Sequence, residues 1–137
     1  ILAGNDFRNR YKPFGFLSPL SIRMSAGVAN IIVTRAGSAL FEIAAWGTPS
    51  LVIPITHSNN DHQRKNAYNY ARAGGCIVIE ENNFTPHVLI HETDRIINDI
   101  NLYNRMSQAA KEFYIPDAAE KIARKVIEIG LSHLPKE

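Results

Sequence analysis

A glycine between two apolar runs marks the first place where this sequence could do chemistry. Gly37, in the segment 35–38 (Arg-Ala-Gly-Ser), follows a β-branched run and precedes an apolar stretch. A glycine there lets the backbone approach a ligand, and the free amides and dipole of a helix start favour a phosphate or pyrophosphate. A tight turn with Ser38 as an ordinary N-cap would use the same residues. The spacing matches neither a Walker loop nor GxGxxG, so both interpretations stay open.

Glu42 is the only polar side chain in the run 39–46. A helix this apolar is expected to be buried nearly all round, and a carboxylate is rarely buried without a partner. One turn into the helix, Glu42 could accept hydrogen bonds from a ribose diol beside bound phosphates. A role in stabilising its own helix N-terminus, or a pair with Arg35, is the alternative.

A third polar segment, residues 54–66, is rich in neutral hydrogen-bonding groups that suit sugar hydroxyls better than phosphates. Asp61 is a plausible N-cap, which would place His62 and Gln63 in the first helical turn, pointing into a crevice. A solvated loop is the alternative. His57 and His62 have no third ligand at a diagnostic spacing, so no metal site is expected.

These segments need a scaffold that brings them together. The runs 30–34, 50–55 and 76–79 are typical of buried strands, and the stretches 39–46 and 61–73 between them are typical of helices. This order predicts an α/β fold: a parallel sheet with helices on both faces, whose ligand crevice lies beyond the carboxyl ends of the strands. Three segments fall at that edge, which are residues 35–38, 56–63 and 80–82.

Outside this unit, a further strand is expected near residues 11–16 and a helix at about 21–29. After residue 83 the pattern is helical, with starts at Pro86, about Leu102 and residues 116–117, so the C-terminal end is predicted to be helical.

Composition narrows the class of protein. The 137 residues are 45% hydrophobic, which suits a single domain with one core. A net charge of +2, with scattered basic residues, gives no argument for a nucleic-acid partner. The single cysteine, Cys76, cannot form an intrachain disulfide and fits a reducing, cytoplasmic setting. We find no membrane-spanning apolar run, no signal-peptide pattern and no GxSxG nucleophile motif.

Taken together, the polar motifs and their spacing resemble glycosyltransferase family 28. The resemblance runs from about Tyr11 to Gly130 and is carried by the segments 33–38, 41–50, 53–54, 61–63, 66–67 and 115–123. It implies a Rossmann-like domain, the C-terminal half of a GT-B fold, which binds UDP-N-acetylglucosamine (UDP-GlcNAc). The implied reaction is inverting transfer of GlcNAc to undecaprenyl-pyrophosphoryl-MurNAc-pentapeptide, which turns lipid I into lipid II in peptidoglycan synthesis. The implied location is peripheral, at the cytoplasmic face of the bacterial plasma membrane.

The resemblance also implies roles for individual residues. The backbone near Phe16 and Leu17 would contact the uracil, and Glu42 would take the ribose hydroxyls. The diphosphate would face the amides of Ser38, Ala39 and Leu40, and the GlcNAc hydroxyls would contact His62 and Gln63. Neither a cofactor nor a metal is implied. Four residues separate Gly37 from Glu42, where the family usually has five.

The expected organisation is a single, truncated donor-binding domain over residues 1–137, without the acceptor-binding N-terminal domain. The acceptor and the catalytic base would belong to that domain, so no catalytic residue is assigned here. Other GT-B transferases remain open as alternatives, namely a glycolipid synthase or a split-subunit GlcNAc transferase. A sugar-nucleotide epimerase and a non-catalytic nucleotide-sugar-binding module are the others.

Overall fold

A parallel sheet forms the centre of the computed structural model, which describes residues 7–56 and 59–133. Its three strands are β1 (Ile32–Thr34), β2 (Ser50–Val52) and β3 (Cys76–Val78), in the order β1-β2-β3. Both pairings are parallel, with Ser50 opposite Ile32 on one side and Cys76 on the other. The predicted α/β fold with a parallel sheet is therefore confirmed. β2 is shorter than predicted, because Pro54 has no amide to donate to a neighbouring strand.

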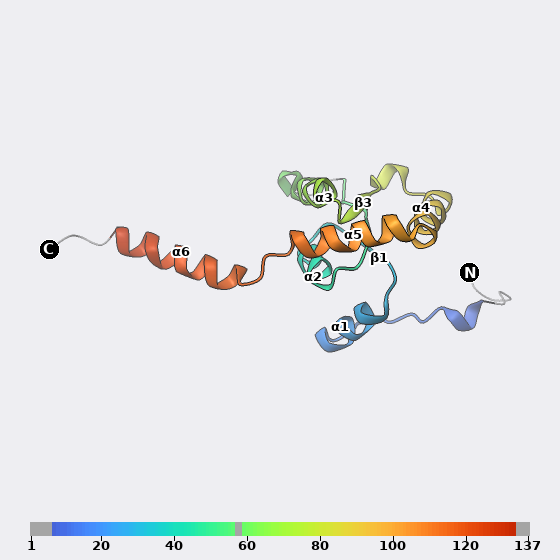
Figure 1. Cartoon of the computed structure of the whole chain (residues 1–137), viewed down its shortest axis with the longest axis horizontal. Helices are drawn as coiled ribbons and strands as arrows, with labels where there is room; N and C mark the ends of the chain where they lie inside the picture. Colours follow the sequence, from blue (N-terminus) through green and yellow to red (C-terminus); the bar gives the residue numbers. More distant parts are fainter. Residues whose placement is uncertain (1–6, 57–58, 134–137) are drawn as a thin grey trace.

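The described residues also form six α-helices and three short 3-10 turns (Figure 1). The helices are α1 (Pro19–Val28), α2 (Ala39–Trp46), α3 (His62–Ala73), α4 (Pro86–Asn98), α5 (Ile100–Phe113) and α6 (Ala118–Ser132); the turns are η1 (Arg8–Arg10), η2 (Asn59–Asp61) and η3 (Glu81–Asn83). Thr85 caps α4 by accepting a hydrogen bond from the amide of Val88 at 3.2 Å. Gly47 and Gly74 end α2 and α3 with φ of 68° and 92°, a left-handed conformation that glycine adopts without strain.

The two faces of the sheet carry separate apolar clusters. On one face, Val52 and Cys76 pack with α2, α3 and the second half of α5, through Leu40, Ala44, Ala67, Tyr70 and Ala110. On the other face, Leu51, Ile53 and Ile79 pack with Ile96 of α4 and Met106 of α5. Because α5 contributes to both clusters, it joins the two layers that hold the sheet.

The segment before α1 differs from the prediction. The expected strand near residues 11–16 does not form: this stretch has no strand pairing with any described residue. Its aromatic side chains, Tyr11, Phe14 and Phe16, are exposed. A strand needs a neighbour for its backbone hydrogen bonds, and none lies beside it here. The predicted helix that follows does form, with the Ser18 hydroxyl accepting from the amide of Ser21 at 3.2 Å.

Helix α6 extends away from the rest of the molecule (Figure 1). All of its residues are exposed, including the apolar side chains of Ile122, Val126 and Ile129. The first residues of this predicted helix follow Asp117, whose backbone is left-handed with φ of 64°. Within the described ranges, no helix has the length and apolar character needed to cross a membrane.

The thiol of Cys76 provides a test of the core. Its side chain is 6% exposed, and burial raises its pKa to about 12. Since the thiolate is the reactive form, we expect an aromatic disulfide reagent at pH 8 to react with the native chain at least about 100-fold more slowly than with the unfolded chain. Absorbance of the released thiol measures both rates. Rapid labelling of the folded protein would contradict this packing.

Candidate functional site

The carboxyl ends of the three strands bring the polar segments to one edge of the sheet. Arg35 follows β1 directly, the described residues 53–56 and 59–61 follow β2, and Glu81 lies just after β3, at the start of η3. This is the edge at which parallel sheets bind ligands. The segments that the sequence analysis selected therefore lie together, although they are far apart in the chain.

A cavity of about 320 Å³ lies between α1, β1 and α2. Its lining comes from Leu17, Ile22, Ser25, Ala26, Ala29, Ile32, Thr34, Ala39, Glu42, Ile43 and Trp46. Leu17, Ala39 and Glu42 are thus brought together by the structure. Phe16, the neighbour of Leu17, is 86% exposed and does not line the cavity.

One face of α2 lines this cavity. Ala39, Glu42, Ile43 and Trp46 are spaced by three or four residues, which places their side chains on the same side of the helix. Leu40 and Ala44 point to the other side, into the core. The expectation that α2 is buried nearly all round is therefore wrong: its cavity side is open, and Glu42 is exposed.

The carboxylate of Glu42 makes no hydrogen bond or ion pair with any described residue. Arg35, the partner that the sequence offered, pairs instead with Glu81, with 2.7 Å between Arg35 Nη2 and Glu81 Oε1. A pair between Glu42 and Arg35 is therefore not formed. What is left is an accessible acceptor group at a cavity that is otherwise mainly apolar.

The loop before α2 has a serine, Ser38, at the N-cap position but lacks the side-chain hydrogen bond of a capped helix. The amide of Leu40 donates to the carbonyl of Gly37 at 3.2 Å, so it is used within the turn. The amides of Ser38 and Ala39 have no acceptor among the described residues, which leaves them as the better candidates for an anion.

Gly37 is not required by the fold itself. Its φ lies outside the left-handed region, and a Cβ added to it would meet no atom within 4 Å. Neither backbone strain nor packing therefore explains the glycine. The open space beside it is available to a bound molecule.

His62 and Gln63 are the first two residues of α3. Asp61 stands at the N-cap position as predicted, but its side chain makes no capping bond. The Gln63 side chain accepts a hydrogen bond from the amide of Ile55 through Oε1 at 3.1 Å, so it fixes the preceding loop. His57 and Ser58, which belong to the predicted segment, lie outside the described residues. Across the described part of the chain, no group of three or more His, Cys, Asp or Glu side chains is placed to hold a metal ion.

A network around Glu81 connects the three strand ends. Glu81 Oε1 accepts from Arg35, and Glu81 Oε2 accepts from the amide and hydroxyl of Thr56 at 3.2 and 3.0 Å. The amide of Thr56, and then the Arg35 side chain, hold the pKa of Glu81 below its ordinary value. Sequence reasoning placed residues 80–82 at this edge and gave Glu81 no role, because its partners lie 25 and 46 residues away.

Comparisons with known proteins identify the family of this chain. The model of the glycosyltransferase family 28 C-terminal domain matches residues 4–122. The chain belongs to this family. The resemblance inferred from the motifs is confirmed.

Two curated relatives carry the name UDP-N-acetylglucosamine--N-acetylmuramyl-(pentapeptide) pyrophosphoryl-undecaprenol N-acetylglucosamine transferase. The protein of Natranaerobius thermophilus is 35% identical over 125 residues, which cover 90% of this chain and 33% of that protein. A Bacillus cereus protein, numbered 1 under the same name, is 37% identical over 120 residues, covering 87% of this chain and 32% of that protein. The chain thus spans about a third of the length of these relatives.

A solved structure shows the same fold. The crystal structure of Acinetobacter baumannii MurG matches with a TM-score of 0.73 and 22% sequence identity, covering 85% of this chain and 33% of that one. This chain therefore shares the parallel sheet, the covering helices and the helical C-terminal end with that structure.

The lowered pKa of Glu81 predicts a pH dependence of stability. A carboxylate whose pKa is lower in the folded than in the unfolded chain stabilises the fold above its unfolded pKa, and this contribution is lost as the pH falls through its folded pKa. We expect Glu81→Gln to unfold at lower urea concentration than the wild type at pH 7. The difference in urea midpoint between the wild type and Glu81→Gln should become smaller below about pH 4.

Urea unfolding followed by circular dichroism at both pH values measures this effect. Glu128→Gln is a suitable control for the loss of one charge, since Glu128 pairs with Lys125 on the exposed helix α6. A gap between wild type and Glu81→Gln that stays constant from pH 7 to pH 3 would refute the assignment.

Proposed function

We propose that this chain binds UDP-GlcNAc as the donor-binding domain of an enzyme that transfers GlcNAc to a lipid-linked muramyl pentapeptide. The observation that carries the proposal is the unpaired carboxylate of Glu42, which lines a mainly apolar cavity one turn after the Gly37 loop. Family membership and the names of the relatives support the choice of donor and acceptor.

The cavity suits the nucleoside. Its apolar walls, among them Ile43 and Trp46, suit a flat base. Leu17 lines the cavity, so its backbone and that of its exposed neighbour Phe16 would meet the edge of the base. A carboxylate has two oxygens that accept hydrogen bonds, so Glu42 can take both hydroxyls of a ribose. Because Glu42 has no protein partner among the described residues, nothing must be broken before the ribose binds.

The start of α2 suits the diphosphate. The amides of Ser38 and Ala39 lie at the positive end of the helix dipole, and the absence of a side chain at Gly37 leaves room for phosphate oxygens. Donors held in place there would stabilise the negative charge that develops on UDP as the bond to the sugar breaks. The amide of Leu40 donates to the carbonyl of Gly37, so Leu40 shapes the turn and does not supply a donor to the diphosphate.

The start of α3 supplies the sugar contacts. His62 and Gln63 are the first two residues of α3, which follows β2, the neighbour of the strand that leads to Gly37. The proposal gives this chain donor binding and no catalytic base, cofactor or metal. An acceptor with an undecaprenyl chain places the reaction at a membrane surface, so we include a peripheral position at the cytoplasmic face of the plasma membrane.

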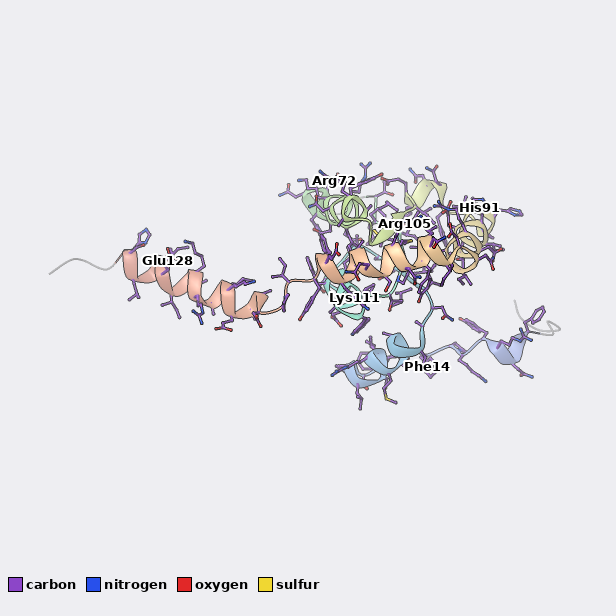
Figure 2. The ribbon with its side chains drawn as sticks, viewed as in Figure 1. Phe14, Arg72, His91, Arg105, Lys111 and Glu128 are labelled. Atoms are coloured by element: carbon purple, nitrogen blue, oxygen red, sulfur yellow. The ribbon has the colours of Figure 1, made fainter. Side chains whose placement is uncertain are left out.

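Calorimetric titration of the chain with UDP and with UDP-GlcNAc tests the proposal. Both ligands should bind, and Glu42→Ala should weaken binding by roughly 1–3 kcal/mol through the lost hydrogen bonds to the ribose. The matched control is Glu128→Ala, since Glu128 is an exposed helical glutamate on α6, away from α1 and α2 (Figure 2). A folded wild-type chain that binds neither ligand, or an unchanged affinity in Glu42→Ala, would refute the proposal.

The variant Gly37→Ala distinguishes an effect on stability from an effect on ligand binding. The added methyl group meets open space in the protein, so the midpoint of thermal unfolding should stay within a few degrees of that of the wild type. In the bound state the same methyl group occupies the space of the diphosphate, so the affinity for UDP should fall by about tenfold or more.

Gly130→Ala is the matched control for this change, because Gly130 also has open space around it but lies on α6. It should keep the wild-type affinity for UDP. Equal affinity for UDP in Gly37→Ala and in the wild type would show that no ligand approaches Gly37.

A further inference from the structure

Glu81 holds two loops at the edge of the sheet and touches no part of the cavity that contains Glu42. We propose that Glu81, acting through Thr56 and Arg35, is a positioning residue for the sugar end of the donor site. This inference rests on the proposed function, and it concerns how the site distinguishes UDP-GlcNAc from UDP.

The two oxygens of the Glu81 carboxylate accept hydrogen bonds from different residues. Oε1 accepts from Arg35 Nη2 at 2.7 Å, while Oε2 accepts from Thr56 N and Thr56 Oγ1 at 3.2 and 3.0 Å. Arg35 Nη1 in turn donates to the carbonyl of Ile53 at 3.3 Å. One carboxylate therefore connects the residue after β1, the loop after β2 and the turn after β3.

The loop that Glu81 holds leads to the sugar contacts. Thr56 is bound to Glu81, and its neighbour Ile55 donates its amide to the side chain of Gln63 at 3.1 Å. A shift of the backbone at residues 55–56 therefore moves the group that orients the Gln63 side chain. These two bonds link Glu81 to the Gln63 side chain through residues 55 and 56.

The nucleotide end has supports of its own. Leu40, Ile43 and Ala44 anchor α2 in the core, and Asn66 Nδ2 donates to the carbonyl of Ala36 at 3.3 Å. None of these contacts involves Glu81. Loss of the Glu81 carboxylate should therefore disturb the sugar end more than the diphosphate and ribose end.

The Arg35–Glu81 pair is too exposed to be needed chiefly for stability. The two side chains are 50% and 37% exposed, and ion pairs in such surroundings contribute little to the free energy of unfolding. A carboxylate with three defined donors nevertheless restricts the geometry of the groups around it. Variants of this network are therefore expected to fold, so that their binding can be compared.

The test measures dissociation constants for UDP and for UDP-GlcNAc in each variant. In Glu81→Gln, the amide nitrogen cannot accept from Arg35, so one side of the network is lost. We expect the affinity for UDP-GlcNAc to fall about tenfold more than the affinity for UDP, because misplacing a contact group by an ångström has effects of this size. A general loosening of the domain would weaken both ligands equally.

Thr56 provides a second, milder pair of variants. Thr56→Val keeps the shape and loses the hydroxyl donor, so it should change the ratio of the two dissociation constants in the same direction as Glu81→Gln. Thr56→Ser keeps both donors to Glu81 Oε2 and should restore the wild-type ratio. The control Glu128→Ala should leave the ratio unchanged.

The outcomes separate this inference from the proposed function. If the wild type binds both ligands and the ratio is the same in Glu81→Gln, Thr56→Val and Thr56→Ser, the positioning role is overturned while the donor site stands. If the folded wild type binds neither ligand, the donor site itself is refuted, and the positioning role with it. A ratio that changes in Glu81→Gln and Thr56→Val and returns in Thr56→Ser supports the proposal.

Discussion

The parallel pairing of β2 with both β1 and β3 is the constraint on which the site depends. Parallel strands have all their carboxyl ends at one edge, so Arg35, the loop after β2 and Glu81 must emerge together. A one-residue slip of β2 would turn Val52 from the α2 and α3 side to the side of α4. The buried residues on both faces thus fix the register, and the register fixes which polar groups meet.

One side of helix α2 packs in the core, and the other side lines the cavity. Leu40 and Ala44 lie in the core, and burial of a leucine side chain contributes about 1.5–3 kcal/mol. Glu42 and Ala39 face the cavity, and Glu42 makes no hydrogen bond or ion pair with any described residue. Because Glu42 and Ala39 are not among the buried residues of α2, they can change without loss of the fold.

The sequence predicted correctly those helices whose ends are set by nearby residues. Helix α2 was predicted with its observed bounds, because its apolar run ends at a glycine that adopts a left-handed backbone. The expected strand near residues 11–16 failed, since strand formation depends on a neighbour that composition does not reveal. The burial of Glu42 was also predicted wrongly, because exposure depends on how far α1 lies from α2. The role of Glu81 was not predicted, since both of its partners come from other strand ends.

The spacing between Gly37 and Glu42 places the proposed nucleoside contact on the cavity side of α2. The amide of Leu40 bonds back to the carbonyl of Gly37 at 3.2 Å, so the loop passes directly into the helix. From Ala39 onward the helical spacing is regular, and Ala39, Glu42 and Trp46 share the cavity side. A shift of Glu42 by one position along the helix would rotate its side chain by about 100°, away from the cavity. The four residues between Gly37 and Glu42 are therefore what puts a carboxylate at the cavity one turn after the glycine loop.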